Sequence, residues 1–511
     1  MTRVLSLDFG TGGVRAGVYD IDRRRMLATA DRPYATTYPR LGWAEQQPDD
    51  WISAMVGAAR DAIAKAPAAN GTDADDIAAV AVATTASTVA VCDRNGRPTR
   101  PALLWMDCRA AEEARMTEAV KHPVMAYCGG GDAVEWLVPK AMWLARHEPD
   151  TYARAEVICE AIDFVNFHLT GKWVGSRMNA ACKWNYDSAK ATFVPDVYDT
   201  LGIADLISKL PQEIVPVGGA VGPLLPDMAA RLGIGAKAIV AQGGIDAHIG
   251  ILGADTVAVG GMLLIGGTSV VQLTQLAGLA DVSEFWGPYP NALVDGLWLV
   301  EAGQVSAGSM LDWLSRKLFA LDEGGHHALI REAATRRQDA GLLTLDYWMG
   351  NRTPYRDGTL RGAILGLSLG HDRADIYASA VDSIALGTAN VLSVLGQRGV
   401  TIDRIVMAGG ICRNALWLQA TVDALGRPVE VAHEDNLSLV GTAVCSATAL
   451  GLFPNLAAAA KACSVETRTV LPEPERSRWF ARTLPLYREA TAALTPTLHE
   501  LARRQDAGDA R

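Results

Sequence analysis

The segment RVLSLDFGTGGVRAGVYD, residues 3–20, decides the fold of the first half of the chain. An apolar run ends at Asp8, a glycine-rich turn follows at 10–13, and an alternating apolar run then leads to Asp20. Strand, tight turn and strand predict a β-hairpin, because a dinucleotide-binding fold would continue from its glycines into a helix. Glycines also let backbone N–H groups approach phosphate oxygens closely. The hairpin is therefore either a plain tight turn or a phosphate-binding loop.

A second hairpin of the same design opens the second half of the chain. Residues 260–274, GGMLLIGGTSVVQLT, read as an apolar strand, the turn at 266–269 and an alternating strand. Two such turns could hold one polyphosphate from both sides. Strand and helix periodicities alternate elsewhere. The expected strands lie at 78–84, 238–244 and 404–410, and the expected helices at 51–65, 136–147 and 374–398.

The length of the chain indicates two domains. Its 511 residues exceed what one hydrophobic core usually serves. We expect an N-terminal α/β domain at residues 1–254 and a C-terminal α/β domain at 255–511, facing each other. From the pattern alone, duplication of one unit and two unrelated halves both remain open. Hydrophobic residues at 49% and charged residues at 20% are typical of a globular protein.

Composition also excludes several classes of function. Asp and Glu outnumber Lys and Arg by 57 to 47, and this acidic balance argues against a broad nucleic-acid surface. The first residues have no long apolar stretch, so we expect no signal peptide, and the long apolar run at 255–272 is interrupted by glycines. We therefore expect no membrane segment and a cytoplasmic location. Eight cysteines without a CxxC pair predict reduced thiols and no zinc site.

Asp246 is the strongest candidate for a catalytic group. It follows the expected strand at 238–244, and glycines leave space around it. A carboxylate at the carboxyl end of a strand is well placed to act as a general base. The alternative is an aspartate that caps the next helix. His248 is the other candidate base, although a histidine in an apolar stretch is more often a hydrogen-bonded structural group.

Three further charged positions have open interpretations. Lys183 lies in a polar loop expected at 176–186, and Glu301 follows a strand at 297–300. Buried charges need partners, so these two residues are either ordinary surface groups or both line a polar cavity. The run WMDCR at 105–109 places an aromatic ring beside two charges. It is either a polyol-binding element or a surface ion pair.

Taken together, these residues resemble the FGGY family of carbohydrate kinases. One family signature is matched from Gly362 to Asp382, as GAILGL, seven residues, and DIYASAVD. The other is matched in part by KAMWL at 140–144, with Leu137 where the family usually has Pro, Ser or Thr. The resemblance covers nearly the whole chain. It implies two ribonuclease H-like domains of the actin/hexokinase type, facing each other across an ATP and sugar cleft.

The resemblance also implies roles for matching positions. ATP would be the phosphoryl donor with Mg²⁺, Asp246 the catalytic base, and Asp8 and Asp246 the supports of Mg²⁺ through water. Where many members carry Glu-Ala-x-Ala-x-Gly, this chain has NLSLVG from Asn436, which alters local contacts on the nucleotide side and not the reaction. The positions expected to bind the nucleotide are Gly10, Thr11, Gly12, Arg15, Gly267, Thr268, Gly409, Gly410 and Asn414.

Within the family, several short motifs are most similar to those of ribulokinases. In that group the matching Lys183, Asp246 and Glu301 would contact the hydroxyls of a ketopentose, and Ala86 would line the same pocket. We therefore expect ATP-dependent phosphorylation of a terminal hydroxyl of ribulose to the 5-phosphate, with the sugar and ATP as partners. Phosphorylation of xylulose, ribitol or erythritol and a non-catalytic sugar- or nucleotide-sensing module are the alternatives. The absence of GxGxxG argues against a dehydrogenase. A homodimer is the family-level expectation.

Overall fold

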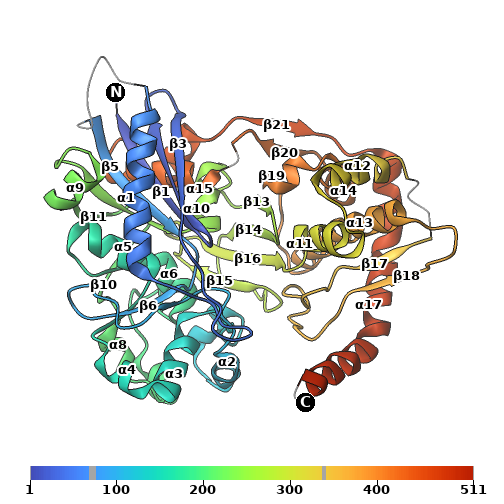
Figure 1. Cartoon of the computed structure of the whole chain (residues 1–511), viewed down its shortest axis with the longest axis horizontal. Helices are drawn as coiled ribbons and strands as arrows, with labels where there is room; N and C mark the ends of the chain where they lie inside the picture. Colours follow the sequence, from blue (N-terminus) through green and yellow to red (C-terminus); the bar gives the residue numbers. More distant parts are fainter. Residues whose placement is uncertain (1, 68–75, 337–340, 435, 510–511) are drawn as a thin grey trace. The chain divides into compact units, whose positions relative to one another are not determined.

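The computed structural model describes residues 2–67, 76–336, 341–434 and 436–509 (Figure 1). The chain folds into two compact units, and neither is continuous in sequence. The second unit comprises Val259–Thr274, Glu301–Asp435 and Glu466–Arg511, and the remaining residues form the first. The domain division expected at residues 254 and 255 stays a prediction.

The first unit is built on a sheet with the strand order β11-β12-β5-β1-β2-β3. The expected hairpin is confirmed, because β1 and β2 pair in antiparallel fashion, whereas β1 pairs with β5 and β5 with β12 in parallel. The strands are β1 (Arg3–Gly10), β2 (Gly13–Asp20), β3 (Arg25–Pro33), β5 (Ile77–Thr84), β11 (Ala220–Pro223) and β12 (Ile239–Ile245).

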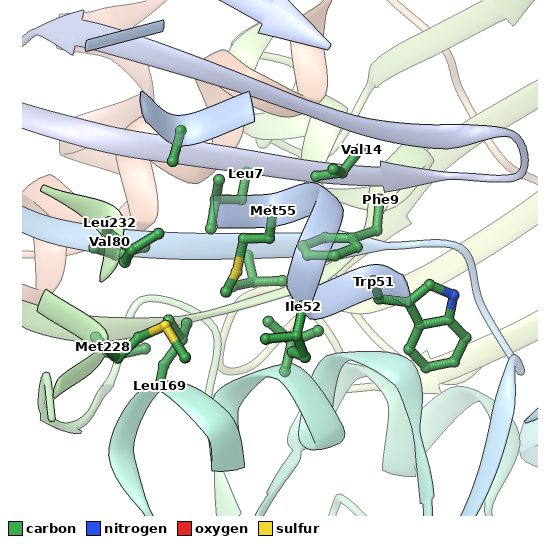
Figure 2. Packing of buried hydrophobic residues seen from close by; sticks show 14 of the residues in the cluster. Leu7, Phe9, Val14, Trp51, Ile52, Met55, Val80, Leu169, Met228 and Leu232 are labelled. Atoms are coloured by element: carbon green, nitrogen blue, oxygen red, sulfur yellow. The ribbon is translucent and has the colours of Figure 1, made fainter. Parts of the chain in front are cut away.

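Helix α1 (Pro48–Lys65) covers one face of this sheet (Figure 1). Its apolar residues recur every three or four positions, so Trp51, Ile52 and Met55 share one buried face. Figure 2 shows these side chains packed with Leu7 and Phe9 of β1. Burial of this apolar surface, at about 25 cal/mol per Å² removed from water, is the main stabilising contribution of the core.

Other elements of the first unit surround that sheet. A smaller sheet has the order β4-β7-β6-β8, and β10 pairs with β9. These elements are β4 (Glu45–Gln46), β6 (Val89–Cys92), β7 (Ala102–Leu103), β8 (Val157–Glu160), β9 (Val174–Ser176), β10 (Glu213–Val215), β15 (Trp286–Pro290), α2 (Ala111–Thr117), η2 (Pro123–Cys128), α3 (Leu137–His147), α4 (Pro149–Arg154), α5 (Ala161–Thr170), α6 (Arg177–Lys183), α7 (Pro195–Thr200), α8 (Leu206–Lys209), α9 (Pro226–Leu232), α10 (Asp246–Gly253), α15 (Leu437–Ala449) and α16 (Leu456–Cys463).

Helices α10 and α15 pack closely because glycines lie at their contact. A Cβ at Gly441 would collide with the carbonyl oxygen of Ile249, and a Cβ at Gly253 would lie 2.5 Å from the carbonyl oxygen of Leu437. Small residues at such points let two helix backbones approach each other. This packing attaches α15 to the first unit, although α15 is distant in sequence from α10.

The second unit repeats the topology of the first. Its strands follow the order β16-β14-β13-β19-β20-β21. The second hairpin is confirmed by antiparallel pairing of β13 with β14, and β13 pairs with β19 and β19 with β20 in parallel. The elements are β13 (Gly261–Gly266), β14 (Val270–Leu276), β16 (Trp298–Gln304), β17 (Leu343–Leu345), β18 (Ala363–Leu365), β19 (Arg404–Gly409), β20 (Val429–Ala432), β21 (Thr467–Val470), α11 (Gly308–Asp312), η3 (Trp313–Leu318), α12 (Glu323–Ala333), α13 (Arg373–Gln397), η4 (Gly410–Arg413), α14 (Ala415–Leu425) and α17 (Pro474–Asp509).

One expected element is wrong. The segment 176–186 was expected as a polar loop, but residues Arg177–Lys183 form helix α6, with the Ser176 side chain as its N-cap. Six of its seven residues are buried, including Asn179 and Lys183. A short helix enclosed on nearly all sides has no exposed polar face, so it lacks the amphipathic period that identifies a helix in sequence.

Candidate active site

Three parallel strands of the first unit bring their carboxyl ends to one edge of the sheet. In the paired register, Asp8 of β1 lies opposite Ala83 of β5, which lies opposite Gly244 of β12. Asp246 follows the last residue of β12, Ile245, and is the first residue of α10. The carboxyl ends of parallel strands are where open α/β sheets bind ligands. The sheet therefore places both predicted carboxylates, Asp8 and Asp246, at this edge.

Tyr34 lies close to both Asp8 and Asp246. Burial raises the pKa of Tyr34, and the negative charges of Asp8 and Asp246 raise it further. The hydroxyl donates a hydrogen bond to the Gly10 carbonyl oxygen in the first hairpin. The other candidate base, His248, is a buried residue of α10. Asp246 is thus the better exposed of the two candidates.

Asn436 interacts with Asp8. It is the N-cap of α15, and its side chain accepts a hydrogen bond from the Leu439 N–H. Desolvation raises the pKa of Asp8 to about 6, whereas the charge of Arg15 and a hydrogen bond with Asn436 lower it. The residue that departs from the family pattern therefore interacts with Asp8, in the first hairpin.

The tip of the first hairpin is held from outside. The Trp105 indole N–H donates to Thr11 Oγ1 over 2.9 Å, and the Gln46 side-chain amide donates to the Thr11 carbonyl oxygen over 2.7 Å. Nothing lies within 4 Å of a Cβ built on Gly12. The turn is therefore supported on one side and open at Gly12, as a loop that receives a ligand requires.

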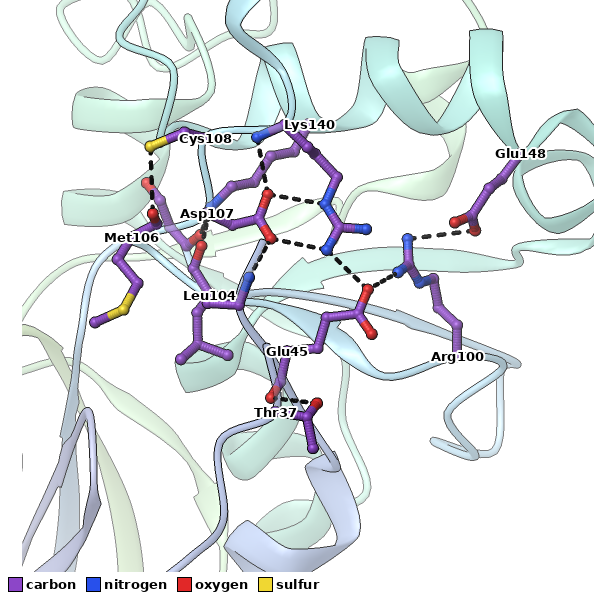
Figure 3. A network of polar contacts seen from close by, with 12 residues as sticks. Thr37, Glu45, Arg100, Leu104, Met106, Asp107, Cys108, Lys140 and Glu148 are labelled. Atoms are coloured by element: carbon purple, nitrogen blue, oxygen red, sulfur yellow. Dashed lines mark hydrogen bonds and ion pairs between the residues drawn. The ribbon is translucent and has the colours of Figure 1, made fainter. Parts of the chain in front are cut away.

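The interpretation of residues 105–109 as a surface ion pair is wrong. Asp107 and the Arg109 side chain are fully buried, and Arg109 donates two hydrogen bonds of 2.8 Å to the Asp107 carboxylate. Glu45 accepts from both Arg109 and Arg100, which completes the network in Figure 3. The Arg109 guanidinium lies 3.8 Å from the centre of the Trp43 ring. Glu45 is 64 residues away from Arg109 in sequence, so no local pattern could predict this burial.

Ala86 lies in the turn that follows β5. The next residue, Ser87, has a φ of 56°, and its carbonyl oxygen accepts a hydrogen bond of 2.7 Å from the buried Lys140 ammonium group. Lys140 also donates to the Leu104 carbonyl oxygen over 2.5 Å. Lys140, the matched signature lysine, therefore joins this turn to the segment that leads to Trp105.

Lys183 lies in an aromatic enclosure and not on the surface. Its Nζ atom lies 4.7 Å from the ring centre of Trp136, 5.0 Å from that of Trp286 and 5.6 Å from that of Tyr289. Lys183 is only 2% exposed. Cation–π attraction from three rings stabilises the ammonium charge where water is largely excluded. Sequence spacing could not show this, because the rings come from segments on either side of Lys183.

In the second unit, the second hairpin contacts the start of α11 and the end of β19. The Gly308 N–H donates to the Gly267 carbonyl oxygen, and the Ser309 N–H donates to the Thr268 carbonyl oxygen, both over 3.1 Å. Gly409 has a φ of 87°, and a Cβ there would lie 2.7 Å from the Gly266 carbonyl oxygen. Only glycine meets both conditions without strain.

A pocket of about 970 Å³ opens beside this junction. Four predicted nucleotide positions line it together: Gly267, Thr268, Gly410 and Asn414. Gly409 is adjacent to Gly410 in the chain. Sequence reasoning missed the other walls, because they come from separate helices and loops. The missed residues include Trp313, His326, His327, Trp348, Tyr377 and Trp417.

Glu301 lies on β16 and is 7% exposed. It belongs to the second unit, whereas Lys183 belongs to the first. On the same strand, Gln304 donates to Asp346 Oδ2 over 3.1 Å and accepts from Thr388 Oγ1 over 2.7 Å. These buried contacts fix the strand that carries Glu301.

Known proteins are similar to this chain in sequence and fold. The N-terminal domain model of the FGGY family of carbohydrate kinases matches residues 3–253, and the C-terminal domain model matches residues 262–450. An FGGY carbohydrate kinase domain-containing protein from Homo sapiens is 29% identical, with 93% of this chain and 94% of that protein covered. A ribulokinase from Shouchella clausii is 28% identical, with 93% and 92% covered.

A solved structure agrees with the sequence relatives. The xylulose kinase from Rhodospirillum rubrum superposes with a TM-score of 0.85 at 25% identity, covering 97% of this chain and all of that chain. The fold is therefore the two-domain α/β fold of the actin/hexokinase type, as predicted. With both domain models matched in order, the chain belongs to the FGGY family of carbohydrate kinases.

Proposed function

We propose that this enzyme transfers the γ-phosphoryl group of ATP to a terminal hydroxyl of a ketopentose, with ribulose as the first candidate and the sugar 5-phosphate as product. The observation that carries the proposal is the strand-end position of Asp246, one residue beyond β12 and near Asp8. A carboxylate there is accessible to a substrate hydroxyl at the sheet edge where ligands bind.

In the proposed reaction, Asp246 accepts the proton of the attacking hydroxyl. The hydroxyl oxygen forms a bond to the γ-phosphorus, the bond to the β–γ bridging oxygen breaks, and ADP leaves with that electron pair. Asp246 Oδ1 accepts the Ala247 N–H over 2.7 Å, which orients the carboxylate. Phosphoryl transfer otherwise needs mainly positioning and charge stabilisation from the protein.

The residues at the sheet edge fit a magnesium ion. Asp8 Oδ1 is buried and accepts no hydrogen bond from the described residues. Mg²⁺ prefers oxygen ligands and keeps several waters, so Asp8 and Asp246 would hold it through water. When bound, it would neutralise charge on the ATP phosphates.

ATP is the donor that a carbohydrate kinase implies, and the pocket of the second unit suits its nucleotide. Its volume of about 970 Å³ lies near the upper end of ordinary ligand sites. The rings of Trp313, Trp348 and Trp417 offer apolar surface for a base. The second hairpin would face the phosphates through Gly267 and Thr268. The proposed phosphate-binding positions of the first hairpin are Gly10, Thr11, Gly12 and Arg15.

For the sugar, Lys183 and Glu301 are the proposed hydroxyl-binding groups, and Ala86 is the proposed lining residue on the side of Lys183. The similarity to a ribulokinase over most of the chain supports ribulose. The similarity to a xylulose kinase structure supports xylulose as the second candidate. Ribitol and erythritol remain further alternatives.

The decisive experiment is a sugar panel. ADP release would be measured by a coupled assay with D-ribulose, L-ribulose, D-xylulose, ribitol and erythritol at saturating MgATP. We expect the highest kcat/KM for one ribulose enantiomer. A clear preference for xylulose or a polyol would overturn ribulose as substrate and retain the kinase, whereas an Asp246→Asn variant with wild-type turnover would overturn the general base.

One helix in the described residues, Arg373–Gln397, is long and apolar enough to cross a membrane, but 72% of its most apolar window is buried inside the protein. That burial is typical of a core helix. The cytoplasmic location and the homodimer stay predictions.

A further inference from the structure

Glu160 is a buried carboxylate at the junction of β8 and α5. Its Oε2 atom accepts hydrogen bonds from the Ser87 N–H over 2.6 Å and from the Asn179 amide over 2.7 Å. Its Oε1 atom accepts from the Trp184 indole N–H over 2.9 Å. Glu160 is fully buried, and none of these three donors is a charged group.

The three donors come from two segments that are distant in sequence. Ser87 follows Ala86 in the turn after β5, while Asn179 and Trp184 lie on either side of Lys183. One carboxylate therefore joins the turn that carries Ala86 to the helix that carries Lys183. The Ser87 carbonyl oxygen is fixed as well, because it accepts a hydrogen bond from Lys140, so both backbone polar groups of Ser87 are held.

Only an ionised carboxylate suits these donors. It accepts with both oxygens and donates with neither, whereas a carboxylic acid or an amide turns a donor toward one of the three N–H groups. Desolvation by burial is the largest effect and leaves the pKa of Glu160 above its ordinary value, although the hydrogen bonds from Asn179, Ser87 and Trp184 and the charge of Lys183 lower it. The three N–H donors, and not this pKa, indicate a carboxylate that accepts at both oxygens.

We propose that Glu160 is a positioning residue for the sugar site, which fixes the Ala86 turn and the Lys183 helix relative to each other without touching the substrate. The inference rests on the proposed function, in which Ala86 and Lys183 line the sugar site. It assigns to Glu160 a role in sugar affinity that a purely structural buried carboxylate would not have.

The test is Glu160→Gln, with sugar KM, ATP KM and Tm measured together. The glutamine amide must point its NH₂ group at either the Trp184 donor or the Ser87 and Asn179 donors, which forces the two segments apart. We expect the sugar KM to rise roughly tenfold or more, where tenfold corresponds to about 1.4 kcal/mol, and the ATP KM to stay within about twofold. KM is measured for whichever sugar the wild type prefers, so an error about ribulose does not affect this test.

A second variant distinguishes positioning from loss of stability. Trp184→Phe removes the donor that faces Oε1, so a glutamine at 160 can keep its oxygen toward Ser87 and Asn179. The double variant Glu160→Gln/Trp184→Phe is expected to recover part of the sugar KM relative to Glu160→Gln alone. If Glu160→Gln folds poorly, Asn179→Ala, which leaves the carboxylate in place, is expected to raise the same KM by a smaller factor.

Glu113→Gln is the matched control. Glu113 is also a fully buried carboxylate of the first unit, but it accepts from Arg146, away from both segments. We expect a lowered Tm and unchanged KM values. A Glu160→Gln enzyme with lowered Tm and wild-type sugar KM, an equal rise of both KM values, or no recovery in the double variant would each overturn the positioning role.

Discussion

Asp8 and Arg15 lie directly opposite each other on the paired strands β1 and β2, yet the pKa of Asp8 is raised to about 6. The guanidinium favours the carboxylate, but desolvation of the carboxyl outweighs it. Arg15 is exposed to solvent, where its charge is screened. The first hairpin therefore holds a carboxyl group that ionises at a higher pH than an ordinary aspartate.

This pKa predicts a pH dependence of stability. In the unfolded chain Asp8 ionises near its ordinary value of 3.8, and in the folded protein near 6. Between these values the unfolded state binds fewer protons, so the contribution of Asp8 to stability falls as pH rises from about 4 to 6 and then stays constant. Asp8→Asn should remove this cost and raise stability at pH 7–8 by roughly 1–3 kcal/mol.

The measurement is urea unfolding of wild type and Asp8→Asn from pH 4 to pH 8, without nucleotide or Mg²⁺. The stability difference in favour of the variant should grow up to about pH 6 and level off above it. A difference that is independent of pH would show that Asp8 ionises normally in the fold.

Asp246→Asn should lower kcat by about 10²- to 10⁴-fold, because the amide cannot accept the proton of the sugar hydroxyl. Nucleotide affinity, measured by calorimetry with ADP, should be nearly unchanged. Asp227→Asn is the control, since Asp227 is an exposed aspartate in the first turn of another helix, α9. Equal kcat values for the two variants would contradict the role of Asp246.

Lys183→Met and Glu301→Gln should each weaken sugar binding and reduce the preference between ribulose and xylulose. Loss of a hydrogen bond from a charged group costs about 1.5–3 kcal/mol, which is roughly tenfold or more in kcat/KM. The ATP KM should not change. Lys190→Met, at an exposed lysine, serves as the control. Equal losses on every sugar together with weaker ATP binding would assign both residues to the fold or to the nucleotide.

Gly409→Ala should raise the ATP KM and lower stability, because the new Cβ meets the Gly266 carbonyl oxygen and displaces the second hairpin. Gly399→Ala is the matched control. Gly399 also has a positive φ, 80°, but a Cβ there has open space. The control should lose about 1–2 kcal/mol of stability with a wild-type ATP KM. If both variants have the same ATP KM, the contact at Gly266 does not shape the pocket.

Much of the fold could be predicted from local patterns. The two glycine hairpins, the strand before Asp246 and helices α1, α3 and α13 were expected close to their observed bounds. Each has a regular period of apolar residues or a glycine turn between two such runs, which is information carried within about 20 residues.

Helix α6 and the Asp107–Arg109 network could not be predicted in the same way. The helix is buried on nearly all sides, and the Asp107–Arg109 ion pair is packed against Glu45, which comes from a segment 64 residues away in sequence from Arg109. A local period reports only the contrast between an apolar face and a solvent face. Where that contrast is absent, only the packing determines the structure.

Local patterns in the sequence predicted the alternation of strands and helices and the candidate positions Asp8 and Asp246, because strand ends and glycine turns are encoded by neighbouring residues. The signature motifs predicted the family. Long-range packing brings three aromatic rings around Lys183, joins the Ala86 turn to α6 through Glu160, and gathers Trp313, Trp348 and Trp417 at one pocket. These arrangements depend on contacts between residues far apart in the chain, and such contacts leave no period in the sequence.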